Sequence, residues 1–109
     1  MTGVGEQIRG HFRSAFNLSD EAIERLTETS RMALFEGLAA LRASLDASDA
    51  FGAGRWAHSV KGTLLNAGLA RMAEEVGGLE QALAHGEAGQ ARGRLDVLED
   101  GLKAFLNGH

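Results

Sequence analysis

The sequence predicts an all-α fold, which we expect to be an antiparallel four-helix bundle of up-down-up-down order with an additional short N-terminal helix. Apolar residues recur at intervals of three and four along most of the chain, and this spacing is typical of amphipathic helices. No run alternates apolar and polar residues over the length of a strand, and β-branched residues are sparse. A chain of 109 residues is long enough for one hydrophobic core.

The short N-terminal helix is assigned to residues 1–17, where four apolar residues share one face: Val4, Ile8, Phe12 and Phe16. We expect this segment to pack across one end of the bundle. The bundle itself is assigned to residues 18–109.

The first bundle helix is predicted to begin after Ser19, because a serine followed by acids suits a helix N-terminus. Leu18 stands where it can form a hydrophobic staple with Ile23. The apolar stripe weakens around residues 29–30, ends at the polar run 46–49 and consists of Ile23, Leu26, Leu34, Leu38, Leu41 and Leu45. Asp49 is then suited to cap the next helix.

The last two helices carry clear stripes and are joined by a short turn. Gly86 stands where a left-handed residue commonly follows a helix end, and His85 beside it can interact with the last carbonyl groups. The two helices are therefore expected to be antiparallel. Their stripes are Leu69, Met72, Val76, Leu79 and Leu83, followed by Ala88, Ala91, Leu95, Leu98, Leu102 and Phe105.

Composition excludes several classes of function. The chain has no cysteine, which rules out disulfides, thiolate nucleophiles and cysteine-based zinc sites. No histidine has a carboxylate partner at the spacing of a helical metal site, so no metal is expected. A formal net charge of −4 with scattered Lys and Arg argues against nucleic-acid binding. No apolar run of about 18 residues and no secretory signal are present, so we expect a cytoplasmic protein without membrane contact.

The predicted third helix contains the run AHSVKGTLLNAG, residues 57–68. On a helical wheel of about 100° per residue, the side expected to be buried consists of Trp56, Val60, Leu64 and Ala67. His58 points away from that side, and no carboxylate stands one turn away along the helix. Its neighbours on the wheel are Arg55, Lys61, Gly62 and Leu65. The wheel predicts an exposed imidazole near two cations, and a buried or acid-bound imidazole would contradict it.

This arrangement suits phosphoryl chemistry. An exposed imidazole has a reference pKa near about 6.5, so a neutral nucleophilic ring nitrogen is available without an activating base. Lys61 and Arg55 can attract a phosphoryl group and offset its charge. Gly62 costs about 1 kcal/mol of helix stability relative to alanine, and we interpret it as a gap that gives access to His58.

The run from His58 to Gly68 resembles the signature of histidine-containing phosphotransfer (HPt) domains: histidine, any residue, an aliphatic, lysine, glycine, a small residue, then asparagine and glycine. Asp49, nine residues before the histidine, resembles that family's turn into the active helix. The resemblance covers about residues 19–107, including the closing pair of helices.

The resemblance implies that His58 accepts a phosphoryl group on its outer ring nitrogen from a receiver-domain aspartate and passes it to another receiver in a two-component phosphorelay. Lys61 and Gly62 would take the phosphate-environment and access positions. The chain would have no kinase activity of its own. It would also hold no cofactor, because the Mg²⁺ ion belongs to the receiver. The expected partners are response-regulator receiver domains, including that of a hybrid histidine kinase, and the expected state is a monomer.

Three positions depart from the family pattern. Leu64 and Leu65 stand where small residues are more common, and Ala67 replaces a larger aliphatic. Leu64 faces the predicted core and can compensate for Ala67 in volume. Leu65 lies on the histidine side, where we interpret it as part of the surface that docks a receiver. Asn66 and Gly68 match the residues that end the active helix.

Two other functions stay open at this point. One is a helical adaptor that binds a partner through an apolar strip, with His58 incidental. The other is a non-phosphorylated module that docks on a receiver or histidine kinase and inhibits it. The intact Lys61 and Gly62 favour the active phosphotransfer module. The initial methionine and the end of the chain soon after the last helix favour a free-standing module.

Overall fold

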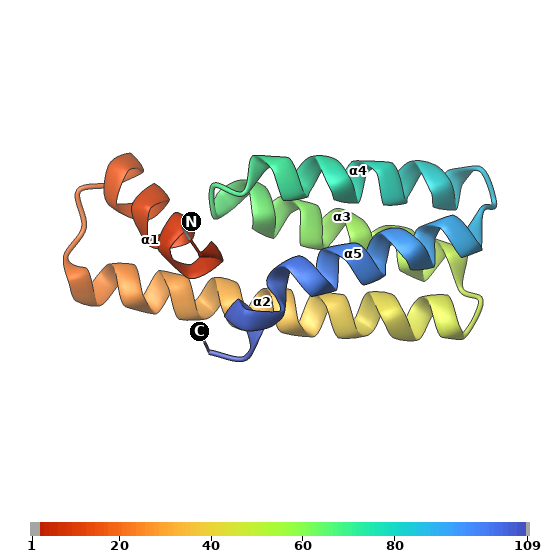
Figure 1. The fold of residues 1–109 in the computed structure, drawn as a ribbon, viewed down its shortest axis with the longest axis horizontal. Helices are drawn as coiled ribbons and strands as arrows, with labels where there is room; N and C mark the ends of the chain where they lie inside the picture. The colour runs from red at the N-terminus through yellow and green to blue at the C-terminus, as the bar shows by residue number, and fades with distance from the viewer. Residues whose placement is uncertain (1–2, 109) are drawn as a thin grey trace.

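A computed structural model describes residues 3–108 and shows five helices in that range. They are α1 (Val4–Ala15), α2 (Asp20–Asp46), α3 (Ala50–Asn66), α4 (Ala70–Ala84) and α5 (Ala88–Leu106) (Figure 1). The described residues contain no strand, so the all-α prediction is confirmed. Two residues of the predicted N-terminal segment, Met1 and Thr2, and the last residue of the predicted bundle, His109, lie outside the described residues.

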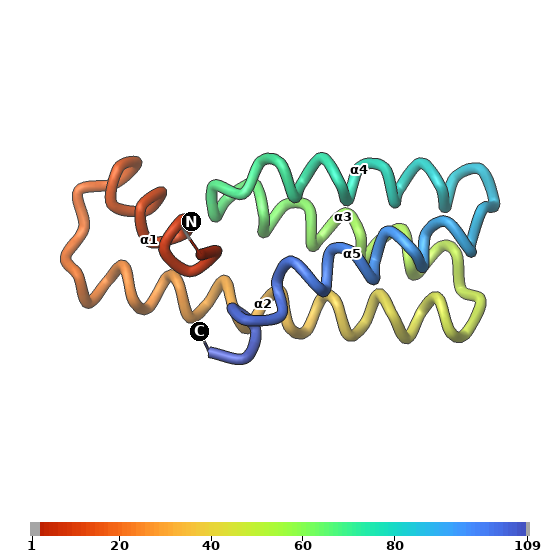
Figure 2. The backbone as a smooth tube through the Cα atoms, viewed as in Figure 1, coloured from red at the N-terminus to blue at the C-terminus, as the bar shows by residue number. Residues whose placement is uncertain are grey.

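Helices α2 to α5 form a four-helix bundle in which consecutive helices run in opposite directions (Figure 2). Each packs on its neighbours in sequence, and α5 packs back on α2, so the α2–α5 edge lies opposite the α3–α4 edge. The long α2 extends past the other three helices, and α1 folds back along this extension (Figure 1). The expected bundle with an N-terminal helix at one end is therefore observed.

The predicted helix starts rest on side-chain caps. The Ala22 N–H donates to the Ser19 hydroxyl at 3.2 Å, and the Gly52 N–H donates to the Asp49 carboxylate at 2.9 Å. Each bond satisfies one amide group that has no partner inside its helix. Leu18 stays 38% exposed, so it adds little to the staple expected with the buried Ile23.

Most residues of the predicted stripes are buried or half-buried, and three are exposed. Phe16, predicted on the apolar face of the N-terminal helix, follows the end of α1 and is 51% exposed. Leu26 is 37% exposed and Thr27 is buried in its place, where its hydroxyl donates to the Ile23 carbonyl at 2.8 Å. This bond allows a polar residue on the buried face of α2. Ala88, the first stripe residue of α5, lies at the end of the bundle and is exposed.

The assignment of Trp56 to the core is wrong, because its side chain is 41% exposed. The buried face of α3 is instead centred on small residues, Ala53 and Ala57, next to Val60 and Leu64. Here α3 lies close to α2: a Cβ atom placed on Gly37 would be 2.8 Å from a methyl carbon of Val60. Such close packing leaves no room for an indole between the two helices.

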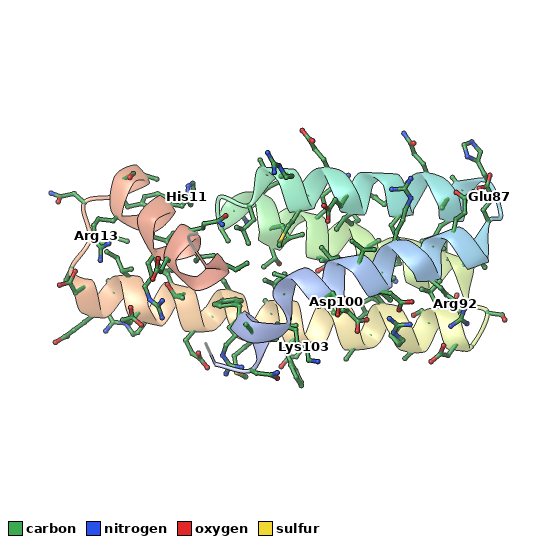
Figure 3. All side chains as sticks on the ribbon, in the orientation of Figure 1. His11, Arg13, Glu87, Arg92, Asp100 and Lys103 are labelled. Carbon is green, nitrogen blue, oxygen red and sulfur yellow. The ribbon has the colours of Figure 1, made fainter. Side chains whose placement is uncertain are left out.

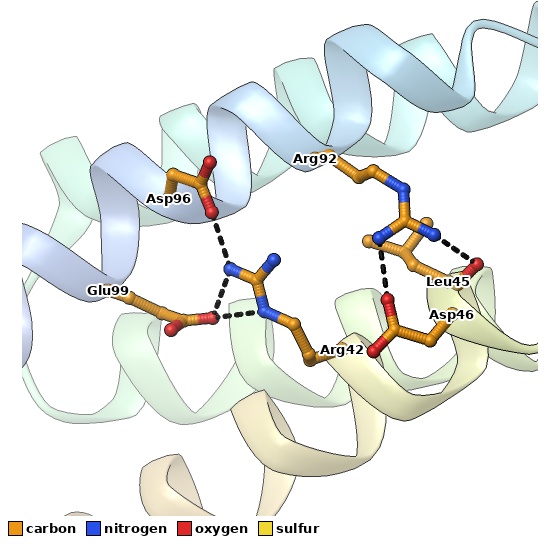
Figure 4. A network of polar contacts seen from close by, with 6 residues as sticks. All are labelled: Arg42, Leu45, Asp46, Arg92, Asp96 and Glu99. Carbon is orange, nitrogen blue, oxygen red and sulfur yellow. Dashed lines mark hydrogen bonds and ion pairs between the residues drawn. The ribbon is translucent and has the colours of Figure 1, made fainter.

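Charged groups join α2 to α5 (Figure 4). Arg42 donates to Asp96 at 2.6 Å and to Glu99 at 2.8 Å, and these hydrogen bonds, chiefly that to Asp96, raise the pKa of Arg42. Arg92 donates to Asp46 at 2.6 Å and to the Leu45 carbonyl at 2.8 Å. The Leu45 carbonyl, at the C-terminal end of α2, also accepts from the Ser48 N–H at 3.1 Å, so Arg92 adds a second hydrogen bond to it.

The turn between α3 and α4 is in contact with α1. Gly68 has a left-handed backbone, with φ of +81°. The His11 side chain of α1 lies against it, since a Cβ atom on Gly68 would be only 2.4 Å from the His11 Cγ atom. Figure 3 shows His11 on the side of α1 that faces this turn.

We predict that Gly68→Ala lowers the free energy of unfolding by about 2 kcal/mol, because alanine disfavours a left-handed backbone and its methyl group displaces His11. Urea denaturation measures the change. The matched control is Gly77→Ala in α4, where a Cβ atom meets open space, and this variant should gain about 1 kcal/mol. Equal effects of the two substitutions would contradict the proposed contact.

Candidate functional site

His58 lies near the middle of α3 with its side chain 77% exposed. The buried residues of α3 occupy the other side of the helix, facing α2 and α4. The structure therefore places this imidazole on the open surface, as the wheel predicts. Its ring nitrogens are accessible to a second protein.

The charge around the imidazole differs from the prediction of two cations and no nearby acid. Glu80 of α4 lies beside it, with Oε1 at 2.6 Å from Lys61 Nζ and Oε2 at 3.7 Å from His58 Nδ1. The wheel misses Glu80 because it compares residues within one helix. Lys61 is thus charge-compensated, whereas the imidazole is beyond hydrogen-bond distance from the carboxylate and is not locked to it.

Arg55 is the second predicted cation, and it is exposed one turn before His58. No ion pair joins it to another residue in the part of the chain that the structure describes. Arg55 is therefore the uncompensated cation beside the imidazole.

Gly62 lies one turn after His58, inside α3. A Cβ atom at this position would meet nothing within 4 Å, so packing within the chain does not require a glycine there. An interior helical glycine lowers stability by about 1 kcal/mol relative to alanine. The open space beside His58 is consistent with the access role predicted for Gly62.

Exposed apolar residues flank the imidazole on both sides. Leu65, two turns after His58, is 53% exposed, and Phe51, two turns before it, is 78% exposed. We call the row Phe51, His58 and Leu65 the α3 strip. Sequence reasoning selected Leu65 but missed Phe51, although its spacing of seven residues from His58 is the same and could have identified it.

A shallow groove runs beside the α3 strip, between α3 and α4. Its walls include Phe51, Arg55 and His58 from α3, and Glu80 and Leu83 from α4. The groove therefore combines an apolar surface with one free cation and the imidazole. A protein surface that covers it would meet His58 at one side.

Comparison with known families assigns the chain. A family model described as Hpt domain matches residues 18–108, which include α2 to α5 and His58. The chain belongs to the Hpt domain family. Domains of this family have a phosphotransfer role in phosphorelays and typically interact with receiver domains. No curated protein and no solved structure gives a significant match.

The Hpt match begins after α1. Within residues 3–108, no three His, Cys, Asp or Glu side chains gather as a metal site would require. None of the described helices has the length and apolar character needed to cross a membrane. The residues gathered at the site are an exposed imidazole, a nearby cation and exposed apolar side chains.

Proposed function

We propose that this Hpt domain is a phosphoryl carrier in which His58 accepts the phosphoryl group from one receiver aspartate and donates it to another. The observation that carries this proposal is the imidazole at the motif position of α3, 77% exposed and next to the open space at Gly62. A nucleophile for a partner's active site has to project beyond its own scaffold, and His58 does so.

The transfer needs no base on this chain. The lone pair of the outer nitrogen, Nε2, forms a bond to phosphorus while the P–O bond of the aspartyl phosphate breaks and its electron pair returns to the aspartate. The reverse sequence on a second receiver regenerates the neutral imidazole. The Mg²⁺ ion and acidic residues that stabilise the migrating group would be those of the receiver, so this chain supplies a positioned nucleophile and leaving group.

The two cations have different parts in this proposal. Arg55 is free to approach the phosphoryl oxygens directly. Lys61 stands at the family's phosphate-environment position, but its ammonium group is held by Glu80 at 2.6 Å. Lys61 would therefore contribute a charge fixed beside the ring, and Arg55 a mobile one.

The α3 strip is proposed as the surface that docks the receiver, including the receiver of a hybrid histidine kinase. Phe51 and Leu65 expose apolar area on both sides of His58, so a partner that covers them places its own site over the imidazole. We propose that a cytoplasmic monomer performs this function, since one His58 and one α3 strip suffice for the transfer.

We predict that His58→Gln abolishes phosphoryl acceptance from a phosphorylated receiver, because glutamine lacks the nucleophilic nitrogen. The assay measures acid-labile, base-stable radioactive label on the protein, and circular dichroism checks that helicity is unchanged. His85→Gln, at the exposed end of α4, is the matched control and should accept label normally. An unlabelled wild-type protein that still binds receivers would instead identify a docking adaptor or inhibitor.

We predict that Gly62→Leu slows transfer at least tenfold, on the order of 1.4 kcal/mol in the barrier, because its side chain enters the space beside His58. Gly62→Ala should raise the free energy of unfolding by about 1 kcal/mol and keep most of the transfer rate. Single-turnover kinetics and urea denaturation measure the two quantities. Unaltered transfer in the leucine variant would overturn the access role.

We predict that Leu65→Ser weakens receiver binding about tenfold, because the exposed leucine loses apolar contact area with the partner. Titration of the receiver, monitored by calorimetry or by the KM for transfer, measures the loss. Val97→Ser on α5 is the control, since Val97 is similarly exposed at 63% but lies away from the α3 strip. Equal losses in the two variants would contradict docking on α3.

A further inference from the structure

We propose that Arg94 of α5, packed on the α4 backbone at Gly78, forms a carboxylate-binding site on a face of the bundle away from His58. The ligand class is a monocarboxylate with a short apolar part, from a free organic acid or from an acidic side chain of another protein. Gly78 and Glu80 are two residues apart on α4, which separates them by about 160° around the helix axis. Since Glu80 lies on the imidazole side, Gly78 lies on the opposite side of α4.

Arg94 packs on the backbone of the neighbouring helix. A Cβ atom placed on Gly78 would be 2.6 Å from Nη1 and 3.0 Å from Cζ of Arg94, so the guanidinium group occupies the space that a side chain would take there. A glycine inside a helix lowers stability relative to alanine. The packing of Arg94 accounts for this glycine, whereas a Cβ atom on the adjacent Gly77 would meet open space.

The N–H donors of Arg94 have no partner in the part of the chain that the structure describes. Its side chain forms no ion pair and no hydrogen bond with another residue in the range 3–108. Arg92, on the α2 side of the same helix, instead donates to Asp46 at 2.6 Å. A guanidinium group that is held by packing and keeps its donors free is suited to bind an anion.

The orientation of the guanidinium group favours a planar anion. Nη1 is the Arg94 nitrogen nearest to the Cβ position of Gly78, Nε is 3.5 Å from it, and Nη2 is not among the three nearest atoms. The edge formed by Nε and Nη2 is therefore the one less covered by α4. This edge presents two parallel N–H groups, which match the two oxygens of a carboxylate.

A shallow hollow between α4 and α5 gives access to Arg94. Its walls include Glu75 of α4 and Gln90, Gly93 and Val97 of α5. The Gln90 amide is a further hydrogen-bond donor, Gly93 leaves space, and Val97, 63% exposed, offers apolar contact. The negative charge of Glu75 repels a doubly charged phosphate more than a singly charged carboxylate. These walls therefore favour a monocarboxylate that carries an apolar part.

The first test titrates the full chain with butyrate and follows the Arg94 Nε–H signal by proton–nitrogen NMR, assigned by its loss in Arg94→Lys. We expect a saturable shift with a Kd on the order of millimolar, together with shifts of the Gly93 and Val97 backbone amides. Arg94→Lys keeps the charge but lacks the two-donor edge, so binding, measured from those amides, should weaken about fivefold or more. A titration without saturation, or equal affinity of the lysine variant, would overturn the site.

Gly78→Ala tests the packing without changing any charge. The methyl group displaces the end of the flexible Arg94 side chain, so the variant should fold and bind butyrate about threefold to tenfold more weakly. Gly77→Ala is the matched control and should bind as wild type does. Glu75→Gln removes a competing negative charge and should strengthen binding about threefold. Equal affinities of the two alanine variants would contradict a site built on Gly78.

Two further probes define the ligand. Inorganic phosphate should bind more weakly than butyrate, and tighter binding of phosphate would overturn the carboxylate assignment. A tetrapeptide with blocked ends, one glutamate and one leucine represents an acidic protein segment, and the same peptide with glutamine is its control. Tighter binding of the glutamate peptide than of butyrate assigns the ligand to a partner protein, and the reverse order assigns a free organic acid. None of these results bears on phosphoryl acceptance, because His58 lies on the other side of α4.

Discussion

The close packing of α3 against α2 is the constraint on which the site depends. Val60 lies so near Gly37 that no side chain fits on the glycine, and Ala53 and Ala57 are buried on the same side of α3 as Val60. Small residues let the two helix backbones approach and fix the rotation of α3 about its axis. That rotation decides that His58 points to solvent. The motif alone therefore does not set the exposure of the imidazole; the small residues on the other side of the helix do.

A second constraint acts between α3 and α4. The pair of Lys61 and Glu80 brings a carboxylate from a neighbouring helix next to the imidazole and compensates the lysine charge. A motif lysine close to a phosphoryl site is easily interpreted as a free phosphate ligand. Here Glu80 already pairs with the lysine, whereas the exposed Arg55 beside the imidazole forms no ion pair with a residue in the range 3–108. The charged groups around the imidazole thus come from two helices, α3 and α4.

Much of the fold follows from local chemistry in the sequence. The stripes predict the helices, and the capping roles of Ser19 and Asp49 are confirmed because a cap depends on residues within one turn. Gly86 likewise has the expected left-handed backbone, with φ of +73°. The error at Trp56 has another origin. A helical wheel ranks residues by apolarity, whereas the width of the gap between two helices decides which of them can be buried.

The residues of the candidate site that lie on α3 could be predicted from the sequence, and the residue from α4 could not. His58, Gly62 and Leu65 follow from spacing along one helix, and Phe51 was within reach of the same reasoning. Glu80 was not, because it stands 22 residues after His58 and approaches it only through the packing of α4 on α3. A single wheel contains no information about a neighbouring helix. The roles of these residues in phosphotransfer remain predictions that rest on the family and on chemistry.

The arginine contacts of Arg42 and Arg92 fasten α2 to α5 on the edge of the bundle opposite the imidazole. A protein that binds at the α3–α4 edge therefore does not have to break these arginine contacts. Rigid-body association of this kind carries little reorganisation cost. This would suit the proposed phosphoryl carrier, because each of its two successive encounters could begin without a rearrangement of the helices.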